Sequence, residues 1–237
     1  MERKDLMSKI YLIRHGQTDW NLEGRIQGCR DIPLNDTGRR QAASLAEGMK
    51  DRRLELVLSS PLCRARETAR VLAESQGVPL LCWRELEEVR YGSWEGMTVA
   101  EIQEQFPEEY RRWWGEAGEG RPPGGESRME AFQRGVFLAE KIRRQVRSHK
   151  LKGVAVVSHG AMLCCMLPAL LKGQAPFEEG FSVQNGGITT LYMDPESGMC
   201  SLEAVNDCSH FSGITVQDGA SSCPAMAGQE ASDVHPM

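Results

Sequence analysis

The chain has 237 residues, of which 41% are apolar and 26% are charged, so it can bury a substantial core as one large domain or two small ones. Its net charge of −5, without a basic face interleaved with aromatic residues, gives no reason to expect a nucleic-acid partner. No apolar run approaches the roughly 18 residues that a membrane helix needs, and the first residues lack the apolar region of a secretory signal. The eight cysteines show no CxxC spacing, which favours reduced thiols and predicts a cytoplasmic protein.

Short apolar runs alternate with amphipathic stretches over the first third of the chain. The runs predict strands, buried on both faces, at 9–14, 54–58 and 78–83. Helices are expected between them. The first runs to about Met49, with Asn35, Asp36 and Thr37 as candidate N-caps, and the second is expected to open at Ser59-Ser60-Pro61, where a serine cap is followed by proline in the first turn.

The alternation continues to about residue 205. A loop punctuated by glycines at 86–96 leads to a helix at 98–114 that breaks near Pro107. Ser127 and Glu130 form a capping box that opens a long helix to about His149, and its expected inward face comprises Met129, Phe132, Val136, Ala139 and Val146. A further helix is expected at 161–171, with strands at 153–157, 188–193 and 200–205.

This order of elements predicts an α/β fold, a three-layer α/β/α sandwich with a mainly parallel sheet. We expect a single catalytic domain at 9–216, in which 97–125 forms a cap over the strand ends. Residues 1–8 are expected to be a leader. Residues 217–237 are expected to be a disordered tail, because Gly, Ala, Ser, Asp and Pro bury too little surface to fold.

Two similar triplets, Arg14-His15-Gly16 and Ser158-His159-Gly160, follow apolar runs and therefore fall at carboxyl ends of predicted strands. Arg64 follows a third strand, and Glu88 lies in the loop after another. Ligands of open α/β sheets bind at these ends, so the side chains should share one pocket. Arginine suits phosphate, and the amides that open the helix after Gly160 should add donors for an anion. We therefore expect a phosphate ester as ligand.

The chain resembles the histidine phosphatase superfamily, in the branch that includes cofactor-dependent phosphoglycerate mutases, over roughly residues 9–210. Arg14-His15-Gly16 is similar to the signature of that family, and Arg64 lies in a segment that is similar to its second-arginine motif. Glu88, before Tyr91-Gly92-Ser93-Trp94-Glu95-Gly96, matches the loop that bears the acid. Ser158-His159-Gly160 resembles the second-histidine motif.

The resemblance implies a phosphoglycerate-mutase-like fold and a reaction through phosphohistidine. His15 would be the nucleophile and Glu88 the general acid, while Arg14, Arg64 and His159 stabilise the transferring phosphoryl group. Phosphate binding would use Arg14, Asn21, Gln27, Arg64, His159 and Gly160. No metal or other cofactor is expected, because the arginines supply the positive charge.

Several neighbours of these motifs leave their roles open. Glu87 is adjacent to Glu88 and is an alternative candidate for the general acid. Only its spacing from Leu86 and Gly92 argues against that role. Gln27, Glu126 and Ser127 have loop or capping roles as even alternatives. Trp113 and Trp114 could pack the cap or wall the pocket. Cys63 is expected to be inert packing, and the remaining histidines, surface or structural, are His149, His210 and His235.

Three functions compete. A phosphomonoesterase acting on a small phosphorylated metabolite is favoured over a phosphoglycerate mutase, because only about thirty largely acidic, Gly/Pro-rich residues separate Gly96 from Ser127. Gly124-Gly125-Glu126-Ser127 also resembles bacterial-type small-molecule phosphatases, including alpha-ribazole phosphatases, so alpha-ribazole 5′-phosphate and broad specificity both stay open. The third reading is a non-catalytic module that binds a phospho-ligand. No membrane or nucleic-acid partner is expected, and a homodimer is among the assemblies left open.

Overall fold

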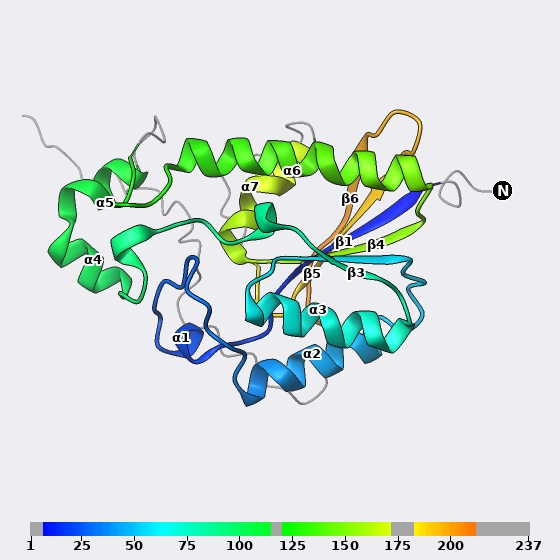
Figure 1. The fold of residues 1–237 in the computed structure, drawn as a ribbon, viewed down its shortest axis with the longest axis horizontal. Coiled ribbons are helices and arrows are strands. Elements are labelled where there is room, and N and C mark those ends of the chain that lie inside the picture. The colour runs from blue at the N-terminus through cyan, green and yellow to red at the C-terminus, as the bar shows by residue number, and fades with distance from the viewer. Residues whose placement is uncertain (1–6, 115–119, 172–182, 212–237) are drawn as a thin grey trace, which may run out of the picture.

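The computed structural model describes residues 7–114, 120–171 and 183–211. Within them a six-stranded sheet has the order β3-β2-β4-β1-β5-β6 (Figure 1). Its strands are β1 (Ser8–Arg14), β2 (Leu56–Ser59), β3 (Leu80–Cys82), β4 (Gly153–Ser158), β5 (Ile188–Met193) and β6 (Cys200–Asp207). The first four strands by number pair in parallel, and β5 and β6 extend the sheet antiparallel beside β1. The predicted mainly parallel sheet is confirmed.

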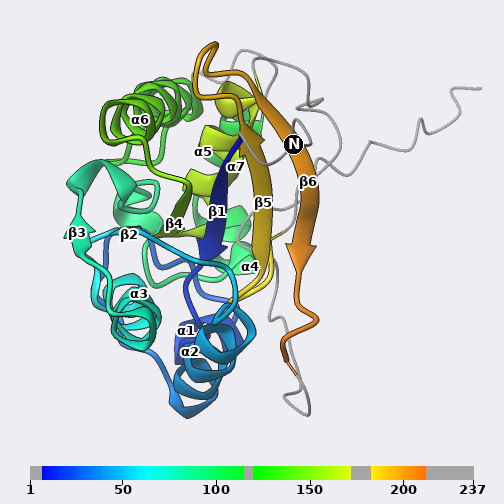
Figure 2. The same ribbon diagram turned by 90° about the vertical axis from the view of Figure 1, so that its right-hand side faces the viewer.

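Helices cover both faces of the sheet (Figures 1 and 2). The α2 (Asp36–Gly48) and α3 (Cys63–Gln76) helices lie on one face, and α6 (Arg128–His149) and α7 (Gly160–Leu170) lie on the other. Alternate residues of β1 divide between the two cores: Tyr11 and Ile13 pack with the α2–α3 side, whereas Ile10 and Leu12 pack with the α6–α7 side. This alternation explains why an unbroken apolar run is needed at a central strand, and the three-layer prediction is confirmed.

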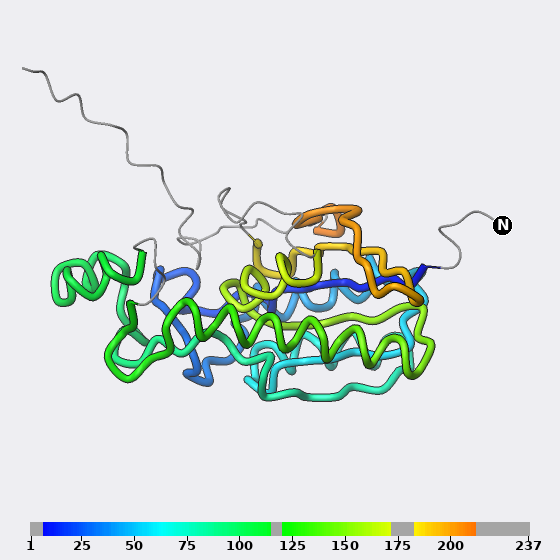
Figure 3. The backbone as a smooth tube through the Cα atoms, turned by 90° about the horizontal axis from the view of Figure 1, so that it is seen from above, coloured from blue at the N-terminus to red at the C-terminus, as the bar shows by residue number. Residues whose placement is uncertain are grey.

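A separate helical unit lies at one end of the molecule. The α4 (Val99–Gln105) and α5 (Pro107–Trp114) helices sit beyond the carboxyl ends of the parallel strands, opposite the end where β1 begins (Figure 3). Thr98 and Glu101 form a capping box for α4, and the chain breaks before Pro107 as predicted. Shorter turns complete the fold: α1 (Asp19–Leu22) and 3₁₀ turns at Arg84–Leu86 and Gly92–Trp94.

The inward face of α6 differs from the sequence prediction. Met129 and Val136 are 47% and 40% exposed, and the buried positions are Ala131, Gly135, Leu138, Ala139, Ile142, Arg143 and Val146. Gly135 explains the difference. A Cβ there would lie 2.5 Å from the Cys165 carbonyl oxygen of α7, so the two helices touch backbone to backbone at the glycine. The close contact turns the flanking large side chains away.

The start of α3 also differs from the prediction. The helix begins at Cys63 with Leu62 as N-cap, and no side chain of its own caps it. Ser60 Oγ accepts the Leu62 amide, and Asp31 Oδ1, from a distant loop, accepts the Cys63 amide at 2.6 Å. A cap supplied from elsewhere in the chain leaves no local sequence signal.

Some predictions fall outside the described residues: most of the 1–8 leader, part of the 97–125 cap, His235 and the 217–237 tail. In the part of the chain that the structure describes, no helix is long and apolar enough to cross a bilayer.

Candidate active site

Three neighbouring parallel strands end at the same edge of the sheet. Arg14 pairs with Ser158 across β1 and β4, and Ser59 pairs with Val157 across β2 and β4. His15, His159 and the first turn of α3 therefore emerge side by side. A pocket at this edge is lined by six of the predicted site residues, namely Arg14, His15, Asn21, Gln27, Arg64 and Glu88.

His15 is held in one orientation and one tautomer. Its Nδ1 lies 2.6 Å from the Gly16 carbonyl oxygen, which can only accept, so Nδ1 carries the proton. Nε2 then bears a lone pair, and Arg64 Nε donates to it at 3.3 Å. Burial lowers the pKa of His15 well below 6.5, and the Arg64 and Arg14 charges lower it further. The ring is therefore neutral at neutral pH, with its lone pair on Nε2.

Arg64 is fully buried yet well satisfied. Its two terminal nitrogens donate to the carbonyls of Arg30 at 2.7 Å and Gly28 at 2.8 Å. Arg14 donates to the Val183 carbonyl at 2.6 Å. Backbone carbonyls thus fix both guanidiniums without neutralising them, and their positive charge stays available to an anion in the pocket.

His159 is buried behind His15. Their ring centroids lie 5.1 Å apart at an interplanar angle of 58°. Neither ring nitrogen of His159 has a hydrogen-bond partner among the described residues, which is costly for a buried polar group and typical of a site that awaits a ligand. Burial lowers its pKa well below 6.5, with Arg64, His15 and Arg14 adding to the effect.

Glu88 bridges the pocket and α7. Its Oε1 accepts the amides of Val89 and Met162, both at 2.9 Å, and its Oε2 accepts the Ala161 amide at 3.2 Å. The amides after Gly160 that we expected to bind an anion are therefore already occupied by Glu88, and that expectation is wrong for positions 161 and 162. The neighbouring Glu87 is not among the residues that line the pocket.

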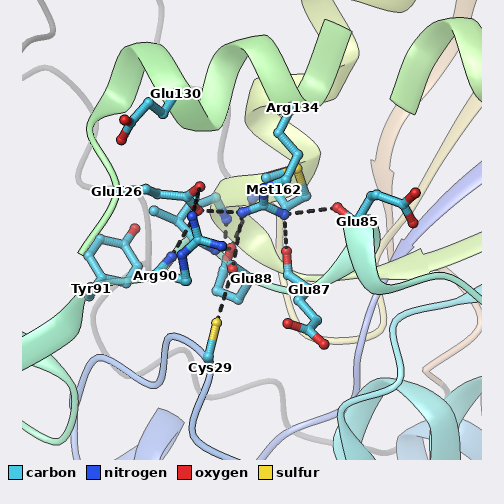
Figure 4. Close-up of polar contacts among 12 residues, drawn as sticks. Cys29, Glu85, Glu87, Glu88, Arg90, Tyr91, Glu126, Glu130, Arg134 and Met162 are labelled. Carbon is cyan, nitrogen blue, oxygen red and sulfur yellow. Dashed lines mark hydrogen bonds and ion pairs between the residues drawn. The ribbon is translucent and has the colours of Figure 1, made fainter. Parts of the chain in front are cut away.

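The sequence analysis missed the pair of Arg134 and Glu126, which holds the loop that carries Glu88 and is called the clamp below. Arg134 of α6 donates to the carbonyls of Glu85, Glu87 and Glu88 at 2.8, 2.6 and 3.2 Å, and it also pairs with Glu126 (Figure 4). Glu126 is 2% exposed and also accepts the Arg90 amide at 2.9 Å. An arginine in a helix of mixed charge carries no motif, so nothing local could have marked Arg134.

A second missed residue, Asn185, reaches the loop that carries His15 from the segment before β5. Its Nδ2 donates to the His15 carbonyl at 3.0 Å, to the Gly16 carbonyl at 3.4 Å and to Asn21 Oδ1 at 3.3 Å. Asn21 Oδ1 also accepts from the backbone and hydroxyl of Thr18. Asn21 is therefore held in place at the pocket wall rather than free to rotate.

Gly16 lies where the backbone after β1 passes close to α2. A Cβ on it would lie 2.6 Å from the Gly38 carbonyl oxygen, and its amide donates to Thr68 Oγ1 at 3.1 Å. The glycine lets the exit from β1 pass against the start of α2.

The remaining candidates divide between pocket and surroundings. Gln27 lines the pocket, is 7% exposed, and its Oε1 has no partner among the described residues. Trp113 and Trp114 both line the pocket. Burial raises the pKa of the Cys63 thiol to about 11, which disfavours a reactive thiolate. Ser127 caps α6, and His149 is exposed at its end.

Comparison with known proteins identifies the family. Residues 10–207 match the model of the histidine phosphatase superfamily (branch 1). Phosphoserine phosphatase 1 of Hydrogenobacter thermophilus is 33% identical over 188 residues, which cover 79% of this chain and 88% of that protein. The 2,3-bisphosphoglycerate-dependent phosphoglycerate mutase 2 of Gloeobacter violaceus is 34% identical over 168 residues, 69% of this chain and 76% of that protein.

A solved structure agrees with these matches. An Escherichia coli K-12 protein with the provisional name alpha-ribazole-5′-P phosphatase superposes with a TM-score of 0.74 and 28% identity, covering 84% of this chain and 96% of that one. The expected fold and enzyme class are confirmed: the chain belongs to the histidine phosphatase superfamily, branch 1.

Proposed function

We propose that this chain hydrolyses small phosphate monoesters through a phosphohistidine on His15, without a metal ion. The observation that carries the proposal is the fixed tautomer of His15. Its Nδ1 faces the Gly16 carbonyl, its Nε2 lone pair faces the pocket beside Arg64, and its lowered pKa keeps the ring neutral. A neutral imidazole nitrogen that points at a cationic pocket suits in-line attack on phosphorus.

The first half-reaction moves the phosphoryl group to the enzyme. His15 Nε2 forms a bond to phosphorus as the ester oxygen leaves, and Glu88 gives that oxygen a proton, so that the alcohol departs neutral. Glu88 Oε2 accepts one backbone amide, which leaves room for a proton on its other side. Arg14 and Arg64 line the pocket where the oxygens gain charge, and His159, whose ring nitrogens have no partner among the described residues, lies against His15 and would add a further donor.

The second half-reaction restores the enzyme. Glu88, now ionised, takes a proton from a water molecule that attacks phosphorus, and the bond from phosphorus to Nε2 breaks. Phosphate leaves, and His15 and Glu88 return to their starting protonation states. The clamp of Arg134 and Glu126 supports this double use, because it holds the Glu88 backbone while only the proton moves.

A phosphoglycerate mutase remains the second candidate, because a mutase is among the relatives. It would share the phosphohistidine but return the phosphoryl group to a phosphoglycerate instead of to water. With 3-phosphoglycerate and a catalytic amount of 2,3-bisphosphoglycerate, we expect release of phosphate without efficient formation of 2-phosphoglycerate.

The test of the proposal is to trap the intermediate. Brief mixing with radiolabelled p-nitrophenyl phosphate in EDTA and an alkaline quench should leave label on the wild-type protein, and acid should release it. His15→Ala should lose the label and at least about 10⁴-fold in turnover, because the covalent route is gone. His149→Ala, at an exposed histidine, is the matched control and should label normally. Label on His15→Ala, or no turnover by the wild type, would overturn the proposal.

A further inference from the structure

The wall of the pocket away from His15 is aromatic. It is formed by residues from α1, the Gly92–Trp94 turn and α5, namely Trp20, Tyr91, Trp94, Tyr110, Trp113 and Trp114. Both walls belong to one pocket, so a phosphate ester seated at His15 would direct its alcohol portion towards these rings.

Part of this wall is core and part is open. Trp94, Trp113 and Tyr91 are at most 8% exposed and belong to the core cluster under α4 and α5. Tyr110 packs on Trp94 with a centroid distance of 6.1 Å and on Trp114 with 6.2 Å. Tyr110 and Trp114 are only half-buried, so they are held by core rings while keeping a face for a ligand. Large rigid rings give apolar contact at small entropic cost.

Trp20 completes the wall from the other side. A Cβ on Gly96 would lie 3.3 Å from the Trp20 ring, and Gly96 has φ of +93°, a conformation that other residues rarely adopt. The backbone at Gly96 thus makes room for the indole. Trp20 is itself half-buried, so it too presents surface to the pocket.

The lining of the aromatic end offers little to a second negative charge, and the Arg128 guanidinium, whose central carbon lies 5.3 Å from the Trp114 ring centroid, is outside that lining. Among the described residues that line the pocket, the basic ones are Arg14, Arg25 and Arg64. Arg14 and Arg64 lie at the His15 end. Arg25 donates to the carboxylates of Glu23 at 2.8 Å and Glu101 at 3.3 Å and to the Gly96 carbonyl, so its charge is already paired.

We propose that the physiological ester carries a bulky, uncharged, apolar or aromatic alcohol that stacks between Trp20, Tyr110 and Trp114. This inference rests on the proposed phosphatase activity and names its substrate class. It sets the chain apart from enzymes that take phosphorylated carboxylic acids, because a carboxylate at this end would meet aromatic faces and a neutralised arginine. An uncharged apolar alcohol would instead remove apolar surface of both partners from water.

Three primary alkyl esters, whose leaving groups have the same reacting end, isolate the effect of the tail. They are propyl phosphate, 3-phenylpropyl phosphate and 3-carboxypropyl phosphate, and kcat/KM is measured for each. We expect the phenyl ester to exceed propyl phosphate by about tenfold or more, as burial of a phenyl ring predicts. The carboxylate ester should fall below propyl phosphate. Because all three release a primary alkoxide, the chemical step does not distinguish them.

Two variants test which residues are responsible. Trp114→Ala and Tyr110→Ser should each reduce the phenyl-to-propyl ratio of kcat/KM by about threefold or more, because they remove contact area from the tail. Trp83→Ala is the matched control: Trp83 is also half-buried but does not line the pocket, so its ratio should stay at the wild-type value.

The outcomes separate this inference from the proposed function. If none of the esters releases phosphate, the proposed function and this inference both fail. If they are hydrolysed but the carboxylate ester equals or exceeds the phenyl ester, only the inference fails. A ratio that Trp114→Ala and Tyr110→Ser leave unchanged would also overturn it.

Discussion

At the strand end of the pocket the side chains are charged or titratable, and main-chain groups hold them. Arg64 rests on the carbonyls of Gly28 and Arg30, and Glu88 rests on three amides. At the α5 end the side chains are aromatic and hold one another, with Trp94 and Trp113 at 5.9 Å and Tyr91 and Trp113 at 5.6 Å between ring centroids.

The two ends therefore place different demands on the fold. Hydrogen bonds to main-chain groups fix the direction of a guanidinium or carboxylate, which the chemistry of phosphoryl transfer requires. Ring packing fixes a surface but no particular direction, which suffices to select a tail by size and polarity. We expect substitutions at the first end to reduce turnover and substitutions at the second to alter selectivity.

The largest effect that we expect in testing this comparison is at Glu88, at the strand end of the pocket. Glu88→Gln should reduce kcat for an alkyl ester by on the order of 10²–10³, because an alkoxide needs a proton as it leaves. The loss for p-nitrophenyl phosphate should be far smaller, since nitrophenolate leaves without one. The aryl ester also reports any damage that glutamine causes by pointing an N–H at the Ala161 amide.

Glu87→Gln is the matched control, because Glu87 is adjacent in the chain but does not line the pocket. It should change neither ester by more than about twofold. Equal losses for aryl and alkyl esters in Glu88→Gln would remove Glu88 from the role of acid.

A smaller effect is expected at Arg134, which contacts the backbone of the loop that carries Glu88 and does not line the pocket. Arg134→Met removes the donors to the carbonyls of Glu85, Glu87 and Glu88 and leaves Glu126 with Arg90 alone of the two arginines. A shift of the Glu88 carboxyl by about 1 Å would cost roughly 10- to 100-fold in kcat for an alkyl ester.

The readout that distinguishes positioning from general damage is again the choice of ester. Arg134→Met should affect the alkyl ester more than the aryl one, because it acts through the acid. Arg144→Met, at an exposed position of the same helix, should leave both unchanged. If Arg134→Met turns over alkyl phosphates at the wild-type rate, the clamp does not position Glu88.

The strand end could be predicted from the sequence for a physical reason. A parallel sheet brings the residues that follow its strands to one edge. Arg14-His15 and Ser158-His159 each follow an apolar run, so they converge there regardless of the conformation of the loops. The loop that carries Glu88 was identified by its resemblance to a family motif. The partners of these residues were beyond reach, because Arg134, Asn185 and Asp31 act through tertiary contacts without a local pattern.

The aromatic end shows where a pattern cannot decide. The pattern favours packing for Trp113 and Trp114 and leaves a pocket wall open as the alternative, and in the structure Trp113 is buried while Trp114 is partly open. The prediction of the inward face of α6 was wrong for a similar reason. Periodicity marks Met129 and Val136 as apolar, but the position of the close contact with α7 depends on Gly135.

The smallest effect that we expect is on the free energy of unfolding. Its dependence on pH should come from the histidines at the strand end. His15 and His159 are buried with their pKa values well below 6.5, so the unfolded chain binds more protons than the folded one once the pH falls below about 6.5. Their contribution to stability is thus fully present above that value and is lost as the pH falls towards the folded-state pKa. Each histidine should cost about 1.4 kcal/mol per pH unit within this window. The aromatic rings bring no such dependence.

His159→Asn isolates one of the two contributions, because it removes the titrating ring and leaves the arginines in place. Urea unfolding at pH 7.0 and pH 5.5 should show that the wild type loses more free energy of unfolding than the variant, by up to about 1.4 kcal/mol. His149→Asn, which changes an exposed histidine, should lose as much as the wild type. If the wild type and His159→Asn lose the same free energy of unfolding, His159 is protonated in the folded protein at pH 5.5. The strand end then loses no stability in acid through that residue.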